Sequence, residues 1–164
     1  MPREIFDPGE DLTLPEDLLS EIGRTERYWA RKKGPSAGMH WSRFRALRLR
    51  TDIEVIDLTL AEANIAAEVT GRNYLRQFGR AGRLGKGEAS VIALVESRKW
   101  VAVVDDAAAR DILLGRATNA RVFTTTEVLR RAAFQGSVTS PMAEQIYQTM
   151  RQFGYWGPEH LWVV

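Results

Sequence analysis

The sequence contains no cysteine, which excludes disulfide bonds and thiolate metal sites. Its two histidines, His40 and His160, are isolated, and neither has a second ligand at metal-binding spacing. No apolar run approaches the roughly 18 residues that a membrane-spanning helix needs, since the longest clear run is Trp100–Val104. The first residues also lack the hydrophobic segment of a signal peptide. These absences predict a cytoplasmic protein with no membrane partner.

Positive charge is concentrated locally, although the formal net charge is only +2. Between positions 24 and 50 the only acidic residue is Glu26, whereas arginine and lysine recur throughout. Such an excess suits a face that binds a polyanion, and it equally suits the solvated outer faces of helices. The residues predicted to contact nucleic acid are Arg31, Lys32, Lys33, Arg43, Arg45, Arg48 and Lys86.

Helices and strands are expected to alternate along a chain whose 164 residues suit a single domain, 1–164. Predicted strands lie at 53–56, at 100–104 and near 120–123. Predicted helices begin at Pro15, at Trp41, after the cap Thr59, at Glu88, after Asp106, at Thr125 and at Ser140. This alternation predicts parallel βαβ units, and therefore an α/β fold: a three-layer α/β/α sandwich around a short parallel sheet.

Four details of this prediction depend on side-chain patterns. The segment 100–104 is continuously apolar, as expected for a strand covered on both faces. Thr124 and Glu127 have the spacing of a capping box for a helix at Thr125–Phe134. The helix after Thr59 is expected to carry one shared apolar face, formed by Leu60, Ala63, Ala67 and Tyr74. The apolar tail at 155–164 is expected to pack on the body of the protein.

Acidic residues follow the strand predicted at 100–104. Asp105 and Asp106 would lie at its carboxyl end, where ligands bind in open parallel sheets. Glu88 begins the preceding helix, so its carboxylate could face the same cleft. Carboxylates without histidine or cysteine select hard cations such as Mg²⁺ or Mn²⁺. An alternative stays open, in which Asp106 caps the next helix and Asp105 pairs with Arg110.

The order of motifs around these acids is specific. Residues 84–94 contain a GxGE pattern and an apolar helix, and residues 100–110 contain an apolar strand, two aspartates and an arginine. A threonine-rich turn with a helix follows at 122–129, and a Pro-Glu helix start lies upstream at 14–22. This order resembles PIN-domain proteins, in particular a branch with a GxGE…DD pattern, over about residues 14–153.

The resemblance implies a metal-dependent endoribonuclease that uses Mg²⁺ or Mn²⁺ to hydrolyse RNA phosphodiesters. Matched by position, the implied catalytic residues are Glu21, Glu88, Asp105 and Asp106. It also implies the toxin of a toxin–antitoxin pair as one biological role. A competing hypothesis is a catalytically degenerate PIN-like module that binds nucleic acid or a protein partner.

The chain departs from the family pattern at its beginning. PIN domains open with a central strand that ends in aspartate, whereas only fourteen residues precede Pro15. Asp7 is therefore a candidate metal ligand beside Glu88, Asp105 and Asp106. Two further possibilities are that a second chain supplies the strand and that the reading frame starts further upstream. The candidate partners are RNA, an antitoxin or other chain that completes the sheet, and a second copy in a homodimer.

Overall fold

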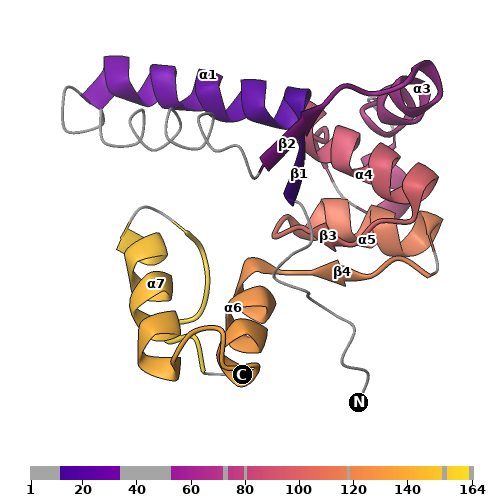
Figure 1. Ribbon diagram of the computed structural model, residues 1–164. Coiled ribbons are helices and arrows are strands. Elements are labelled where there is room, and N and C mark those ends of the chain that lie inside the picture. The colour runs from indigo at the N-terminus through magenta and orange to yellow at the C-terminus, as the bar shows by residue number, and fades with distance from the viewer. Residues whose placement is uncertain are drawn as a thin grey trace. The chain divides into compact units, whose positions relative to one another are not determined.

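The computed structural model describes residues 12–33, 53–71, 74–79, 81–117, 119–152 and 155–162. The chain divides into two compact units, Met1–Lys99 and Trp100–Val164. Each unit combines helices with a two-stranded parallel sheet, which confirms the predicted α/β class and the parallel strands (Figure 1). The assignment of both units to one domain stays a prediction. Among the described helices, none is long and apolar enough to cross a membrane.

The described elements of the first unit begin with a strand that the sequence did not predict. Their order is β1 Leu12–Pro15, α1 Glu16–Lys33, β2 Ile53–Ile56, α3 Leu60–Val69, the 3₁₀ helix η2 Leu75–Phe78 and α4 Lys86–Arg98. β1 pairs in parallel with β2, which places Leu12 opposite Ile53 and Leu14 opposite Val55. Pro15 therefore ends a strand, and the helix begins one residue later. The helix predicted at Trp41 lies outside the described residues.

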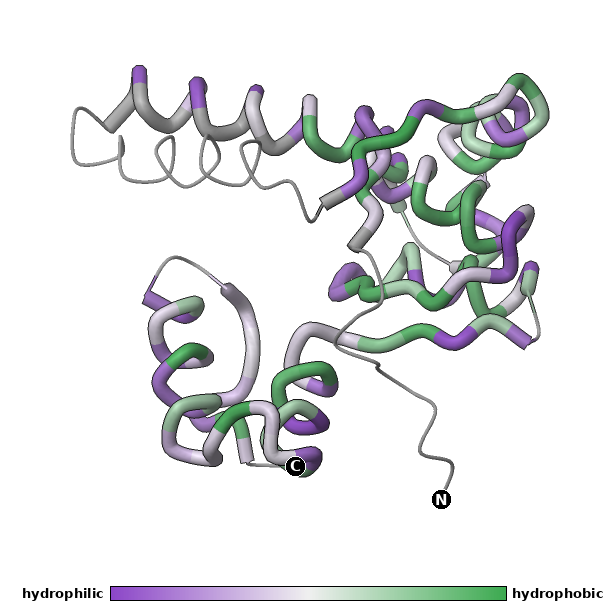
Figure 2. The backbone as a smooth tube through the Cα atoms, viewed as in Figure 1, coloured by the Kyte–Doolittle hydropathy of each residue, from purple (hydrophilic) through white to green (hydrophobic). Residues whose placement is uncertain are grey.

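Helix α4 forms the centre of the first unit's core, and its middle is strongly hydrophobic in Figure 2. Ala89, Ile92 and Ala93 are fully buried, and so is Val69 of the neighbouring helix α3. The predicted apolar face of α3 is wrong. Leu60 is 81% exposed, and Ala63 and Ala67 are exposed as well, while Tyr74 follows the helix. Helix α3 instead turns Val69 and Glu62 inward.

Glu62 is a buried acid that joins α3 to α4. The predicted cap at Thr59 is confirmed as a full capping box, in which Glu62 Oε2 accepts from the Thr59 backbone N–H at 2.8 Å. The same carboxylate accepts from Arg98 Nε at 2.7 Å and from Arg98 Nη2 at 3.0 Å. These charge-assisted bonds from Arg98 hold the pKa of Glu62 at about 2, below its ordinary value of 4.5. This ion pair explains which face of α3 points inward.

The second unit contains short strands and helices of ordinary length. Its elements are β3 Ala102–Val103, α5 Ala107–Arg116, β4 Val122–Phe123, α6 Thr125–Phe134 and α7 Ser140–Gln152. β3 pairs in parallel with β4. The expectation of a strand at 100–104 covered on both faces is wrong, because Trp100 is 37% and Val103 44% exposed. The predicted helix Thr125–Phe134 and its capping box from Thr124 and Glu127 are confirmed.

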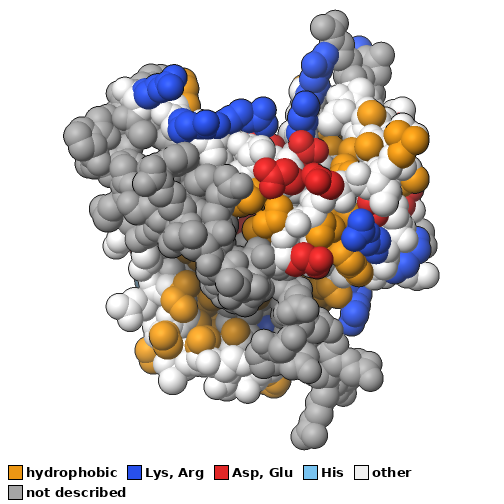
Figure 3. All heavy atoms as spheres, turned by 45° about the horizontal axis from the view of Figure 1, so that its top comes forward, with side chains coloured by type: hydrophobic (Ala, Val, Ile, Leu, Met, Phe, Trp, Pro, Cys, Tyr) orange, Lys and Arg blue, Asp and Glu red, His pale blue; other side chains and the backbone are white. Residues whose placement is uncertain are grey.

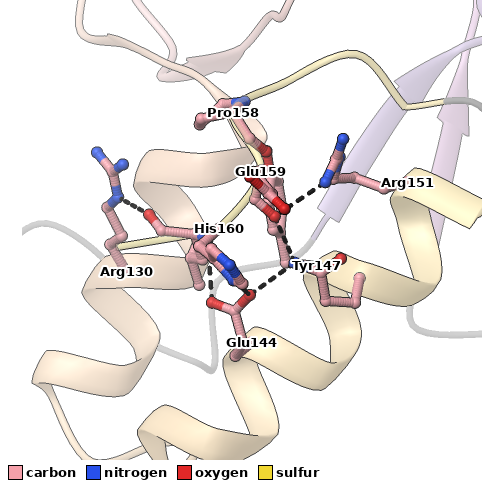
Figure 4. Close-up of polar contacts among 9 residues, drawn as sticks. Arg130, Glu144, Tyr147, Arg151, Pro158, Glu159 and His160 are labelled. Carbon is pink, nitrogen blue, oxygen red and sulfur yellow. Dashed lines mark hydrogen bonds and ion pairs between the residues drawn. The ribbon is translucent and has the colours of Figure 1, made fainter. Parts of the chain in front are cut away.

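The carboxyl-terminal tail packs on α6 and α7, as predicted. Leu161 is fully buried in a cluster with Ala143 and Tyr147. Polar contacts hold the tail's backbone to the two helices (Figure 4). Tyr147 donates to the Pro158 carbonyl at 2.7 Å, and Arg130 donates to the Leu161 carbonyl at 2.6 Å. Further contacts join Gln148 and Arg151 to the Glu159 carbonyl, and Glu144 to the Leu161 N–H and His160.

Gly157 allows the tail to approach Tyr147 closely. A methyl group on this glycine would collide with the Tyr147 hydroxyl, and it would lie 3.2 Å from Cε1 of Tyr155. We expect Gly157→Ala to lower the free energy of unfolding by about 2 kcal/mol, because overpacking strains a well-packed contact. Tyr147→Phe removes the colliding oxygen, so the double variant should recover part of this loss in denaturant unfolding. Simple addition of the two single losses would contradict the collision.

Candidate functional site

Glu88 lies in the first turn of α4, which begins two residues earlier than predicted. Gly85 is the N-cap of this helix, and Glu88 Oε2 accepts from the Gly85 backbone N–H at 2.7 Å. This bond is one of the two hydrogen bonds of a capping box, and it holds the carboxylate at the N-terminus of the helix, where the helix dipole is positive. Glu88 therefore has a defined orientation.

Glu21 of α1 lies beside Glu88. Its Oε2 accepts from the Gly87 backbone N–H at 3.0 Å, so α1 is joined to the start of α4. A methyl group on Gly85 would meet the Glu88 carboxylate and would lie 3.1 Å from Glu21 Oε1. Both carboxylates therefore approach the same glycine. We call Glu21 and Glu88 the helix pair.

The glycines of the GxGE motif have separate structural roles. An added methyl at Gly85 would occupy the space of the helix pair. At Gly87, which is buried, it would lie 2.9 Å from Cα of Leu18, so this glycine allows α4 to approach the backbone of α1. A second contact between these helices was not predicted: the buried Ser90 donates to Asp17 Oδ2 at 3.0 Å. The sequence feature that points to this contact is the spacing of Asp17 and Glu21, which are four residues apart and therefore share a helix face.

Asp105 follows β3 in the second unit and is exposed, yet three donors hold it. Oδ1 accepts from the Thr125 backbone N–H at 2.9 Å and from the Tyr155 hydroxyl at 2.8 Å. Oδ2 accepts from the Thr125 hydroxyl at 2.5 Å. Burial, and then the bond to Asp105, raise the pKa of Tyr155 to about 12, so its hydroxyl stays protonated to a higher pH than that of an ordinary tyrosine.

The alternative prediction that Asp106 caps the following helix is confirmed. Its Oδ1 accepts from the Ala109 backbone N–H at 2.8 Å, at the start of α5. For Asp105, the partners in the described structure are Thr125 and Tyr155, and not the Arg110 that the alternative named. We call Asp105 and Asp106 the strand pair. Sequence reasoning missed Thr125 and Tyr155 as its partners, although the threonine run 124–126 is a visible signal.

The predicted nucleic-acid ligands are only partly described. Arg31 on α1 and Lys86 at the start of α4 are exposed. Figure 3 shows that Lys and Arg side chains line the exposed side of α1, where Arg24 and Arg27 are exposed as well. The remaining predicted ligands lie outside the described part of the chain, either entirely or in their side chains: Lys32, Lys33, Arg43, Arg45, Arg48 and the candidate metal ligand Asp7.

The chemistry of the two pairs suits a hard divalent cation, because both offer carboxylate oxygens only. Among the residues that the structure describes, no group of three or more His, Cys, Asp or Glu could hold a metal ion. Each pair supplies two carboxylates, fixed by hydrogen bonds from the protein. The expectation that Glu88 shares one pocket with Asp105 and Asp106 concerns residues of different units, and it stays a prediction.

Parallel strands, a carboxylate pair at a helix start and another at a strand end define an α/β protein with acidic candidate sites. The PIN-domain family matches residues 48–163, a segment that includes Glu88, Asp105 and Asp106. The chain therefore belongs to the PIN-domain family, whose fold is of the nuclease type. Comparison with curated proteins and with solved structures finds no match. The predicted family is confirmed, and its GxGE…DD branch stays a prediction.

Proposed function

We propose that the chain is a metal-dependent endoribonuclease of the PIN class, with the helix pair and the strand pair as its metal-binding carboxylates. The observation that carries this proposal is the anchoring of the acids in the family-matched segment. Glu88 is fixed by the Gly85 N–H and Asp105 by the Thr125 N–H. Such anchoring holds acidic ligands in a set orientation before a cation binds, which lowers the cost of binding.

Mg²⁺ or Mn²⁺ bound to these carboxylates would supply charge neutralisation and an activated water for phosphodiester hydrolysis. The chain's own contribution is to hold each acid in a set orientation within its own unit. Glu21 is held by the first turn of α4, through Gly87 N–H. Asp106 is held by the first turn of α5, through Ala109 N–H. In this proposal the hydrolysis leaves a 5′-phosphate and a 3′-hydroxyl.

RNA is the proposed substrate, and the cations of α1 support this choice. Arg24, Arg27 and Arg31 are exposed on one helix at spacings of three and four residues, so they lie on one side of it. Cations in such a row attract RNA phosphates, and their contribution falls as salt concentration rises. Lys86 adds an exposed cation at the start of α4, two residues before Glu88.

A second candidate function is a catalytically degenerate module that binds RNA or a protein partner. It is favoured by the small described sheet of the first unit. In the described part of the first unit, β1 and β2 form a sheet of only two strands. A strand from an antitoxin, or from a second copy of the chain, could extend such a sheet. This function predicts RNA binding without turnover.

The test is an assay of RNA cleavage under three metal conditions. We expect the purified protein to cut single-stranded or structured RNA with Mn²⁺ or Mg²⁺ and to lose this activity in EDTA. Excess Mn²⁺ added back should restore cleavage, because EDTA removes the ion and does not alter the carboxylates proposed to bind it. The degenerate module would instead shift RNA in a gel under every condition and leave it intact. Cleavage that is unaffected by EDTA would exclude the metal-dependent mechanism.

A further inference from the structure

We infer that Tyr155 is a positioning residue that orients Asp105 to bind a divalent cation through Oδ2 alone. This inference rests on the proposed function, because it assigns a ligand geometry to one of the proposed carboxylates. It is carried by the hydrogen bond from the Tyr155 hydroxyl to Asp105 Oδ1, at 2.8 Å. The two residues are fifty positions apart in the sequence.

The acceptor capacity of Asp105 determines which oxygen is available. An ionised carboxylate offers about four lone-pair sites, about two on each oxygen. Oδ1 already accepts two bonds, from the Thr125 N–H and from the Tyr155 hydroxyl. Among the described residues, Oδ2 accepts one bond, from the Thr125 hydroxyl. One site therefore remains on Oδ2, so Asp105 can bind a cation through a single oxygen while its three donors stay in place.

Tyr155 prevents rotation of an otherwise exposed carboxylate. Thr125 donates to both oxygens of Asp105 from one side chain and its own backbone. Tyr155 adds a third donor, from a position fifty residues further along the sequence. An exposed carboxylate with fewer donors exchanges them for water and samples other orientations, whereas a ligand fixed by outer hydrogen bonds binds its metal more tightly.

The position of Tyr155 is itself fixed by the tail and by α7. Its backbone N–H donates to the Met150 carbonyl at 3.1 Å, and its ring packs edge-on against Tyr147, with 5.9 Å between the centroids. The following residues are held at the carbonyls of Pro158, Glu159 and Leu161 (Figure 4). Loss of a single tail contact should therefore leave the Tyr155 hydroxyl in place.

The experiment measures Mn²⁺ affinity, by electron paramagnetic resonance of free Mn²⁺ and by calorimetry, without RNA. Tyr155→Phe keeps the ring and removes the donor, and we expect Mn²⁺ to bind about 10-fold more weakly. Tyr147→Phe is the matched control, because it removes an α7 hydroxyl that binds the tail at Pro158 and does not contact Asp105. It should lower the unfolding temperature and leave Mn²⁺ affinity within about twofold of the unsubstituted protein. Thr125→Val, which removes the donor to Oδ2, should weaken binding as Tyr155→Phe does.

The outcomes separate the inference from the proposed function. If Asp105→Asn abolishes Mn²⁺ binding while Tyr155→Phe leaves it unchanged, the positioning role of Tyr155 is wrong and the metal site stands. Equal weakening by Tyr147→Phe would show a general effect of the tail, which also overturns the inference. If the unsubstituted protein binds no Mn²⁺, both the proposed function and the inference fail. Should Tyr155→Phe not fold, Tyr155→Met, which also lacks the hydroxyl, is measured in its place with the same expected weakening.

Discussion

Glu88→Gln should reduce Mn²⁺-dependent RNA cleavage by at least about 100-fold, a loss of about 2.7 kcal/mol of transition-state stabilisation. Glutamine can accept the bond from the Gly85 N–H, since the capping box admits Glu or Gln at this position. The substitution therefore removes a negative charge and keeps the helix start. The measurement is the initial rate of cleavage at saturating Mn²⁺, together with the unfolding temperature.

A matched control exists in the second unit. Glu127 occupies the same third position of a capping box, where it accepts from the Thr124 N–H at 2.7 Å. Glu127→Gln removes an equal charge from an equivalent helix start, and we expect its cleavage rate to stay within about threefold of the unsubstituted protein. Asp105→Asn should lose activity as Glu88→Gln does. Full activity in both Glu88→Gln and Asp105→Asn would refute the carboxylate mechanism.

Helix starts could be predicted from the sequence because a cap is a local structure. Thr124 and Glu127, three residues apart, gave the helix Thr125–Phe134 with its observed boundaries. Thr59 and Asp106 cap the helices that follow them. In each case the side chain and the backbone N–H that it accepts from lie within three residues. Such contacts depend little on the rest of the fold.

The strand at 53–56 was predicted with its observed limits, but the limits of the other strands were not, because they depend on pairing with distant residues. The continuously apolar segment 100–104 suggested a buried strand, yet only Ala102–Val103 pairs with β4. β1 ends in a proline, and its pairing with β2 connects residues about forty positions apart. A proline at the end of a short strand is compatible with the hydrogen bonds of a β-sheet. In the sequence alone, however, the same proline predicts the start of a helix.

The candidate site shows the same division between local and distant causes. The acids themselves were identified from the motif, and Glu21 with Glu88 proved to lie at one glycine. Their anchoring was not predicted, since the Thr125 and Tyr155 donors to Asp105 are twenty and fifty positions away. A motif names the side chains that carry charge. The donors that fix their orientation come from whichever backbone the fold brings near.

Arg98→Met should lower the free energy of unfolding by about 3 kcal/mol at neutral pH, because it leaves the Glu62 carboxylate buried without its cation. The Glu62 side chain is only 4% exposed, whereas that of Arg98 is 29% exposed. Methionine keeps most of the apolar length of the arginine, so the change tests the charge more than the packing. Chemical denaturation at pH 7 measures the loss.

The effect of Arg98→Met should depend on pH in a defined direction. The folded pKa of Glu62 is lowered to about 2 from its ordinary 4.5, mainly by the hydrogen bonds from Arg98. A lowered pKa contributes stability that is fully present above about pH 4.5 and is lost as pH falls toward 2. The difference in the free energy of unfolding between the unsubstituted protein and Arg98→Met should therefore become smaller between pH 5 and pH 3. Glu62→Gln, which has no carboxylate to titrate, should show no such decrease when Arg98→Met is added to it. A difference that stays constant across this range would mean that Arg98 stabilises the α3–α4 contact through packing rather than through the ion pair.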